Sequence, residues 1–222
     1  IVLVARTATT PDFLPMRDAD FRLSPVDLEG TVNRAKAVHT STWPLSREPA
    51  RQWARRALHL AHTQGKVTSL DPNYTPRIWP DRSEALEVLH AIMPDVTITK
   101  PSQDDAERLF GEALSPDEVI RRFHAMGPEI VLFTMGAEGM LRSANGEKSH
   151  IPARPLVVAD ATGAGDAFWS GFLMAYLDGL SPVHCAYVAR ELAERKLQTV
   201  GPLPETQDRT EVYAKAKAAM EG

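Results

Sequence analysis

The sequence predicts an α/β fold in which a mostly parallel sheet is covered by helices on both faces. Short apolar runs rich in β-branched residues alternate with longer stretches whose apolar residues recur at helical spacing. Segments that alternate in this way form βαβ units, which make strands parallel and pack helices against them. The chain has 222 residues, of which 43% are hydrophobic, so it is long enough to bury a large core.

The expected strands are short apolar runs bounded by turn or polar residues, and they cover residues 1–5, 38–41, 67–71, 96–100, 130–134 and 156–159. Two further segments, 139–143 and 147–151, flank Asn145-Gly146, a dipeptide typical of a two-residue hairpin turn. The sheet is therefore expected to end in an antiparallel hairpin.

The expected helices are amphipathic or apolar stretches, and they cover residues 25–37, 48–64, 83–93, 103–110, 116–126, 165–177, 182–197 and 209–220. Ser115-Pro116-Asp117-Glu118 combines a capping-box pattern with proline in the first helical position. Ser24-Pro25 is a weaker start signal of the same kind.

Composition argues against several classes of protein. The net charge is −4 and the sequence pI is about 6.0, which predicts no nucleic-acid partner. No apolar run approaches the roughly 20 residues that span a bilayer, so we expect no membrane partner. Cys185 is the single cysteine, which excludes an internal disulfide and favours a cytoplasmic protein.

The strongest functional signal is a glycine-rich turn between the expected strand 156–159 and the helix that follows. It reads Asp160-Ala161-Thr162-Gly163-Ala164-Gly165-Asp166-Ala167-Phe168. Glycines let the backbone approach a ligand closely, and free N–H groups at a helix N-terminus favour a phosphate. An ionised Asp166 there could accept a proton from a hydroxyl that attacks phosphorus.

Two common nucleotide-binding motifs do not fit this turn. The P-loop pattern is absent, and the glycine spacing does not match the dinucleotide-binding fingerprint, which argues against an NAD-dependent oxidoreductase. A purely structural alternative is a glycine turn followed by a helix capped by Thr162 or Asp166.

The turn resembles the D-T-x-G-A-G-D-x-F signature of the ribokinase (PfkB-type) family of carbohydrate kinases, with Ala161 in place of the commoner threonine. The resemblance implies a ribokinase-like fold and ATP-dependent phosphorylation of a sugar. Asp166 would be the catalytic base, and Gly163 with the amides of Ala164, Gly165 and Asp166 would form the anion hole. Thr162 and Gly165 would contact ATP.

A second segment, Thr134-Met135-Gly136-Ala137-Glu138-Gly139, is similar to the strand-ending T-x-G-x-x-G of that family. This similarity implies that Thr134, Gly136 and Gly139 line the ATP site. The alternative is that the two glycines only serve the following hairpin.

Two segments are similar to sugar-binding parts of the family. Residues 69–79 resemble the D-x-N-x-R-x-x-L-W stretch of fructokinase-like and 2-keto-3-deoxygluconate-kinase-like members, which makes Asn73 a substrate ligand. Thr75 stands at the usual arginine position, so we expect a neutral hexose such as fructose. Arg17 lies in a segment similar to Y-R-x-A-D, near the sugar in relatives, and could instead bind a carboxylate.

The segment Lys100–Glu107 lies where the family has N-x-x-E, which helps to organise Mg²⁺ through water. Asp104 takes the acid position and Pro101 the asparagine position. The alternative is a helix start with acidic residues against the helix dipole.

The resemblance also implies a division of the chain. Residues 1–24 would be a remnant of a lid or edge-strand region, with the small lid incomplete or absent, and residues 25–222 would form the nucleotide-binding and catalytic domain. The family's N-terminal glycine-glycine turn has no match here, so we expect a missing front segment and self-association, for example as a homodimer. A non-catalytic relative that binds nucleotide or a partner protein is the alternative function.

Overall fold

The computed structural model describes residues 2–5, 12–203 and 206–222, so Ile1 of the expected first strand lies outside the described residues. The chain divides into two compact units that interleave along the sequence. Unit 1 contains Pro15–Gly136 and Met140–Lys148, and unit 2 contains the described parts of Val2–Leu14, Ala137–Gly139 and Ser149–Gly222. Because neither unit is one continuous segment, the division into residues 1–24 and 25–222 stays a prediction.

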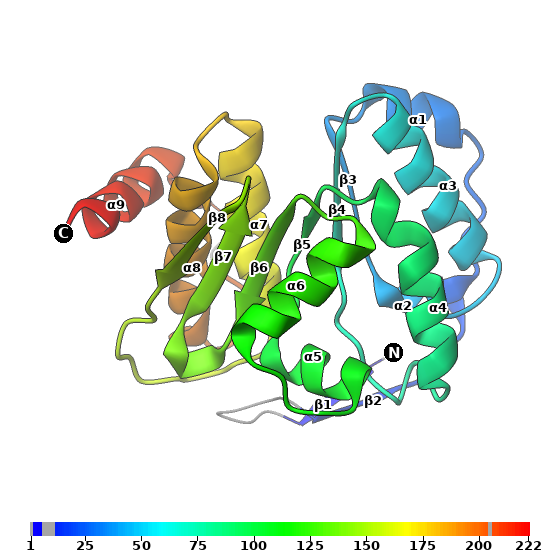
Figure 1. Ribbon diagram of the computed structural model, residues 1–222, viewed down its shortest axis with the longest axis horizontal. Helices are drawn as coiled ribbons and strands as arrows, with labels where there is room; N and C mark the ends of the chain where they lie inside the picture. Colours follow the sequence, from blue (N-terminus) through cyan, green and yellow to red (C-terminus); the bar gives the residue numbers. More distant parts are fainter. Residues whose placement is uncertain (1, 6–11, 204–205) are drawn as a thin grey trace. The chain divides into compact units, whose positions relative to one another are not determined.

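A mostly parallel sheet lies at the centre of unit 1, as the sequence predicts (Figure 1). Its strands occur in sequence order: β3 (Ala37–Ser41), β4 (Val67–Asp71), β5 (Ile98–Thr99), β6 (Ile130–Thr134), β7 (Met140–Ala144) and β8 (Glu147–Ile151). The pairs β3–β4, β4–β5 and β5–β6 are parallel, whereas β6 and β7 are antiparallel. Asn145 and Gly146 both have positive φ, 53° and 78°, which fits the predicted hairpin turn.

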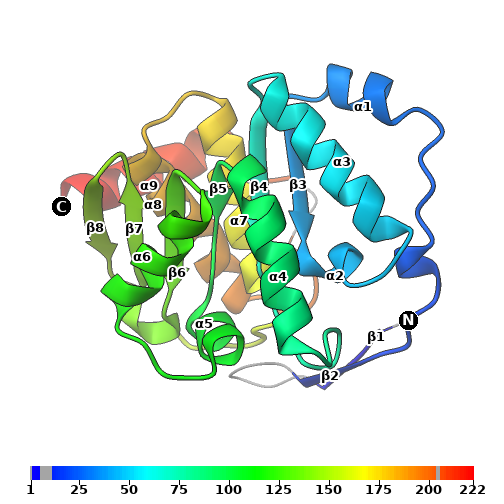
Figure 2. The same cartoon turned by 45° about the vertical axis from the view of Figure 1, so that its right-hand side comes forward.

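The helices of unit 1 connect these strands and bury their apolar faces. They are α1 (Leu28–Arg34), α2 (Thr42–Leu45), α3 (Ala50–Thr63), α4 (Arg82–Ile92), α5 (Gln103–Phe110) and α6 (Pro116–Met126), with 3₁₀ turns η1 (Ala19–Phe21) and η2 (Met93–Asp95). Figure 2 shows α3, α4 and α6 on the same face of the sheet, as right-handed crossovers between consecutive parallel strands require. The core includes the fully buried side chains Leu58, Leu70, Leu89, Val131 and Phe123.

Capping residues explain where several of these helices begin. Ser102 accepts a hydrogen bond from the Asp105 N–H, and the Asp105 carboxylate accepts one from the Ser102 N–H, which completes a capping box for α5. Ser115 caps α6 as predicted, since it accepts from the Glu118 N–H. The expected helix 25–37 was too long, because Asp27 caps α1 and β3 already begins at Ala37.

Unit 2 consists mainly of helices: α7 (Ala164–Leu177), α8 (Pro182–Leu197) and α9 (Arg209–Glu221). It also contains strand β1 (Val2–Ala5), which pairs with β2 (Asp12–Pro15), and most of the 3₁₀ turn η3 (Gly136–Glu138). Helices α7 and α8 approach closely at Gly171, where an added Cβ would lie 3.0 Å from the Cα of Ala189. A larger residue at this position would have to displace the backbone of α8 by a few tenths of an ångström.

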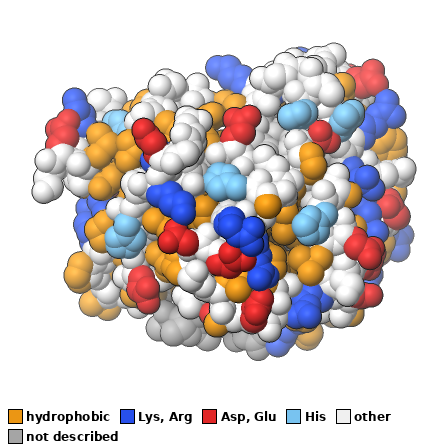
Figure 3. Space-filling model, viewed as in Figure 1, with side chains coloured by type: hydrophobic (Ala, Val, Ile, Leu, Met, Phe, Trp, Pro, Cys, Tyr) orange, Lys and Arg blue, Asp and Glu red, His pale blue; other side chains and the backbone are white. Residues whose placement is uncertain are grey.

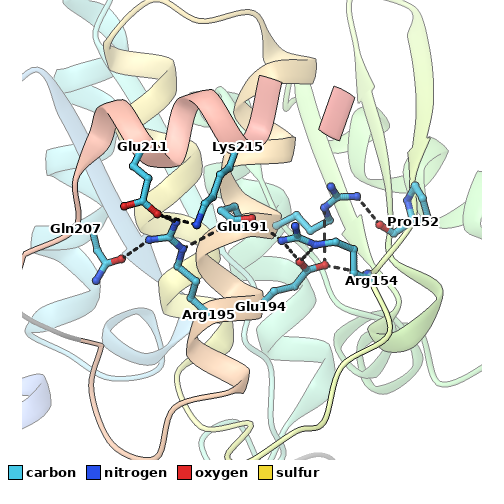
Figure 4. Close-up of polar contacts among 9 residues, drawn as sticks. Pro152, Arg154, Glu191, Glu194, Arg195, Gln207, Glu211 and Lys215 are labelled. Carbon is cyan, nitrogen blue, oxygen red and sulfur yellow. Dashed lines mark hydrogen bonds and ion pairs between the residues drawn. The ribbon is translucent and has the colours of Figure 1, made fainter. Parts of the chain in front are cut away.

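An ion-pair network fixes α8 to its neighbours in unit 2 (Figure 4). Arg154, just after β8, pairs with Glu191 (2.5 Å) and Glu194 of α8. Arg195 pairs with Glu191 at 3.0 Å and with Glu211 of α9 at 3.1 Å. Burial raises the pKa of Glu191, but hydrogen bonds from Arg154 and Arg195 outweigh burial and hold that pKa below its usual value.

The expected strand 156–159 is wrong. Within the described ranges this segment pairs with no strand; instead, the N–H groups of Ala159 and Asp160 donate to the Leu197 carbonyl at the end of α8, at 2.8 and 3.2 Å. The apolar side chain of Val157 is 87% exposed. The expected strand 96–100 is likewise shortened to β5.

The face drawn in Figure 3 shows Lys and Arg side chains interspersed with Asp and Glu. Within the described part of the chain, no helix combines the length and the apolar character needed to cross a bilayer.

Candidate active site

The glycine turn in unit 2 presents a helix N-terminus without a side-chain cap. Gly163 is the N-cap residue of α7 and has a φ of 81°, in the left-handed region that favours glycine. This excludes the alternative in which Thr162 or Asp166 is the N-cap. The Ala167 N–H makes the first helical bond, to the Gly163 carbonyl at 3.0 Å. The amides of Gly165 and Asp166 therefore lie in the first turn, where no intrahelical acceptor exists.

The amide of Ala164 differs from these two. It donates to the Ala161 carbonyl at 3.3 Å, so part of its hydrogen-bonding capacity is used inside the turn. Gly165 itself lies in helical backbone, and the positive φ of the turn belongs to Gly163. The geometry thus favours Gly165 and Asp166 as the anion-binding amides.

The buried carboxylate of Asp160 stabilises the turn. Asp160 accepts a hydrogen bond from the Thr162 N–H at 2.9 Å through Oδ1, and its Oδ2 lies 3.8 Å from Lys196 Nζ. Hydrogen bonding from Thr162 lowers the pKa of Asp160, and the Gly201 backbone N–H and the Lys196 ammonium add smaller contributions in the same direction. Asp160 is therefore ionised at neutral pH.

Two polar groups at the turn remain available to a ligand. The Thr162 hydroxyl is buried and has no hydrogen-bond partner among the described residues. Asp166 is exposed, and a Cβ on Gly163 would lie 3.8 Å from its Oδ2, so the carboxylate lies over the turn. Unit 2 thus places an uncapped helix N-terminus and an exposed carboxylate within a few residues of each other.

In unit 1, candidate residues meet at the carboxyl edge of the parallel strands. Asn73 follows β4 with a φ of 35°, and Gly136 follows β6 with a φ of 56° and open space around its Cα. Thr134 ends β6 and donates its N–H to the Pro101 carbonyl after β5, at 3.0 Å. This edge is where ligands bind in open α/β sheets.

Side chains at this edge differ in what they contact. Asp104 is partly exposed and pairs with Arg108 at 3.2 Å, on its own helix. The neighbouring Asp105 is buried and accepts hydrogen bonds from the Tyr74 N–H (2.7 Å) and the Ser102 N–H (2.9 Å). Sequence reasoning overlooked Asp105, although the Ser-x-x-Asp spacing is a capping-box signal.

A buried ion pair at the same edge was also overlooked. Lys100 Nζ lies 3.5 Å from Asp71 Oδ1; Asp71 is the last residue of β4, and Lys100 directly follows β5. The signal was a charged residue at the carboxyl end of each apolar strand, where a parallel register brings the two together.

Arg17 and Thr75 have structural partners in unit 1. The Arg17 guanidinium donates to Asp20 (2.7 Å), the Ser46 hydroxyl (2.6 Å) and the Trp43 carbonyl (3.3 Å), and its side chain is only 6% exposed. Thr75 is buried, and its carbonyl accepts the N–H groups of residues 78 and 79 in a turn. Sugar binding by Arg17 or Asn73 stays a prediction.

Gly139 has a structural explanation within unit 2. An added Cβ would lie 2.2 Å from the Ile151 carbonyl oxygen, so no larger residue fits. This supports the hairpin alternative for Gly139, whereas the open surroundings of Gly136 leave its assignment to ATP as a prediction.

The candidate residues fall into two groups. Unit 1 holds Arg17, Asn73, Asp104, Thr134 and Gly136, and unit 2 holds Gly139 and the turn from Thr162 to Asp166. Across the described ranges, no three His, Cys, Asp or Glu residues form a group that could hold a metal ion.

Comparison with known proteins adds a family. The sequence profile described as pfkB family carbohydrate kinase matches residues 2–208. The chain is 32% identical over 209 residues to an ATP-dependent 6-phosphofructokinase of Thermoanaerobacterium thermosaccharolyticum, covering 94% of this chain and 65% of that protein. It is 31% identical over 194 residues to a fructokinase of Klebsiella pneumoniae, covering 87% and 62%. The chain thus spans less than two thirds of the length of these relatives.

Solved structures agree with the sequence comparison. The fructokinase of Halothermothrix orenii superposes with a TM-score of 0.70 at 35% identity, covering 91% of this chain and 69% of that one. A PfkB protein of Polaromonas sp. superposes with a TM-score of 0.74 at 22% identity, covering 94% and 66%, and shows the fold alone. The predicted ribokinase-like α/β fold is confirmed.

Proposed function

The chain belongs to the pfkB family of carbohydrate kinases, and we propose that it transfers the γ-phosphoryl group of ATP to a sugar hydroxyl. The single observation that supports this most is the uncapped N-terminus of α7, with Gly163 at positive φ and the exposed Asp166 carboxylate over the turn. A helix N-terminus of this kind favours an anion, and the carboxylate supplies the base that a hydroxyl nucleophile needs.

In the proposed reaction, Asp166 accepts the proton of the sugar hydroxyl while the hydroxyl oxygen bonds to the γ-phosphorus of ATP. The bond between that phosphorus and the bridging oxygen breaks, and ADP leaves with the electron pair. The amides of Gly165 and Asp166 stabilise the negative charge on the transferring group, and the helix dipole adds to this effect. Mg²⁺ brought in with ATP supplies neutralisation of phosphate charge.

The residues present fit an ATP phosphate. The Thr162 hydroxyl is buried without a partner among the described residues, and it could donate a hydrogen bond to an oxygen of the anion. In unit 1, Asp104 has the ion pair to Arg108 and enough exposure to contact a hydrated Mg²⁺ through water. Within unit 1, Thr134 and Gly136 are proposed as ATP ligands and Asn73 as a sugar ligand, at the carboxyl edge of the sheet.

The proposed acceptor is a neutral hexose such as fructose. Fructokinases are among the relatives, and one of them is 35% identical to this chain. Arg17 already donates to Asp20, Ser46 and Trp43, so it has little capacity left for a sugar carboxylate. A related protein is described as a 6-phosphofructokinase, so fructose 6-phosphate should be tested beside fructose.

The direct test measures ATP-dependent phosphorylation of fructose, fructose 6-phosphate and 2-keto-3-deoxygluconate by the purified protein. We expect fructose to be phosphorylated fastest. Faster turnover of either anionic acceptor would refute the neutral-hexose assignment. Binding of ATP without phosphorylation of any of the three would favour the alternative, a non-catalytic nucleotide-binding relative.

A further inference from the structure

We propose that Lys196 is a positioning residue for the phosphate-binding turn. Its buried ammonium holds the Asp160 carboxylate in place, and that carboxylate fixes the backbone of the turn at Thr162. The inference rests on the proposed function of the turn, and it concerns a side chain more than 30 positions away in sequence. Lys196 lies in the last turn of α8, whereas the turn precedes α7.

The Lys196 ammonium bridges two segments of unit 2. It lies 3.8 Å from Asp160 Oδ2 and donates a hydrogen bond to the Thr199 carbonyl at 3.0 Å. The side chains of Lys196 and Asp160 are only 6% and 4% exposed. Charges this far from water need their partners, so the position of one fixes the position of the other.

Asp160 in turn restrains the backbone that leads into the phosphate-binding amides. The second oxygen of Asp160 accepts the Thr162 N–H, and Thr162 directly precedes the N-cap residue of α7. The Lys196 stem also lies against the turn, since a Cβ on Gly163 would be 3.5 Å from Lys196 Cε. Meanwhile the Leu197 carbonyl accepts the N–H groups of Ala159 and Asp160. The end of α8 thus holds the turn in two ways: through the hydrogen bonds accepted by the Leu197 carbonyl and through the Lys196 ammonium beside Asp160.

Removal of the ammonium leaves Asp160 as a buried carboxylate that keeps hydrogen bonds from Thr162 and the Gly201 backbone N–H but has no cation. Such a carboxylate gains free energy by turning toward water, and this movement releases the Thr162 N–H. The first-turn amides of α7 would then lose their fixed orientation toward a phosphate. The backbone bonds from Leu197 remain, so the fold itself should survive.

The chain offers a matched control. Lys217 and Glu221 of α9 are also 3.8 Å apart, but their side chains are 62% and 60% exposed. Lys196→Met and Lys217→Met therefore make the same chemical change to pairs of equal separation that differ in burial. An exposed pair contributes little, so Lys217→Met should behave as wild type.

The test is calorimetric titration of wild type, Lys196→Met and Lys217→Met with MgATP and, separately, with adenosine. Adenosine has no phosphate, so a defect confined to the turn should leave its affinity unchanged. We expect Lys196→Met to weaken MgATP binding about tenfold, with adenosine affinity within twofold of wild type. Lys196→Arg, which keeps the positive charge, should recover most of the MgATP affinity.

Equal losses for MgATP and adenosine would show a merely structural role and overturn the inference, as would unchanged MgATP binding. If Lys196→Met does not fold, Lys196→Gln carries the same test, because its polar amide removes the positive charge and leaves the Asp160 carboxylate in place. A wild-type protein that binds no MgATP would instead refute the proposed function together with this inference. Wild-type phosphorylation with an unaffected Lys196→Met would refute the inference alone.

Discussion

The glycine turn of unit 2 and the carboxyl edge of the sheet in unit 1 are both candidate sites, but their polar groups are used differently. At the turn, the Thr162 hydroxyl lacks a partner among the described residues, and the Asp166 carboxylate is exposed. At the sheet edge, the carboxylate of Asp105 already binds two backbone N–H groups, and Arg17 is held by three acceptors.

This difference separates residues available for chemistry from residues that maintain structure. A carboxylate that accepts buried N–H groups stabilises the fold, because its loss leaves those donors unsatisfied. An exposed carboxylate beside free amides contributes little to stability and can accept a proton. Substitution of Asp166 should therefore change turnover, whereas substitution of Asp105 should change the free energy of unfolding.

The largest expected effect is that of Asp166→Asn. Loss of the base should lower kcat by about 10² to 10⁴-fold, while the backbone amides and the affinity for ATP remain. Steady-state kinetics with fructose and calorimetry with MgATP measure the two quantities. Near-normal turnover of the asparagine variant would remove Asp166 from the mechanism.

The contrasting substitution is Asp105→Ala in unit 1. It leaves the buried N–H groups of Tyr74 and Ser102 without an acceptor, and should cost about 1–3 kcal/mol of unfolding free energy. Asp104→Ala is the matched control, because the exposed pair with Arg108 is worth less than about 1 kcal/mol. Equal destabilisation by both changes, measured in urea, would contradict the structural role of Asp105.

A smaller effect is expected from Gly163→Ala. The alanine must adopt a φ near that of Gly163, which costs roughly 1–2 kcal/mol for a residue with a side chain. Either the protein loses that stability or the turn relaxes and binds ATP less tightly. A variant with wild-type unfolding midpoint and wild-type MgATP affinity would show that the left-handed conformation is not required.

The smallest expected effect concerns pH. The folded-state pKa of Glu191 is held below its usual value, so its ion pairs stabilise the protein above the unfolded-state pKa. That contribution is lost as the pH falls through the folded-state pKa. Glu191→Gln should therefore reduce stability at pH 7 by about 1 kcal/mol and flatten the acid limb of the stability curve. An acid limb identical to that of wild type would exclude Glu191 as its source.

The sequence predicted most of the fold because its local signals agree with the tertiary structure. Strands β4 and β6 and helices α5, α6 and α8 have the predicted bounds. Each of those helices has a serine cap directly before it. The prediction of a strand at 156–159 failed because N–H groups at the end of this segment bond to the Leu197 carbonyl at the end of α8. A local sequence pattern does not indicate a hydrogen-bond partner so distant in sequence.

The part of the candidate site that is formed by backbone groups at the start of α7 could be predicted from the sequence. The spacing of Gly163, Gly165 and Asp166 places these residues at a helix start without any knowledge of other segments. Lys196 and the Arg17 contacts depend on packing between distant segments, which the linear sequence does not display. Gly139 shows the converse case: close backbone packing gives this motif position a structural explanation, and its assignment to ATP stays a prediction.

The central claim is that the first-turn amides of α7 hold the phosphates of ATP. The most direct measurement is the ¹H–¹⁵N spectrum of the labelled protein titrated with MgATP and, separately, with adenosine. The amide resonances of Gly165 and Asp166 should shift with MgATP and remain unchanged with adenosine. If MgATP binds and shifts other amides while those two stay in place, the turn is not the phosphate site.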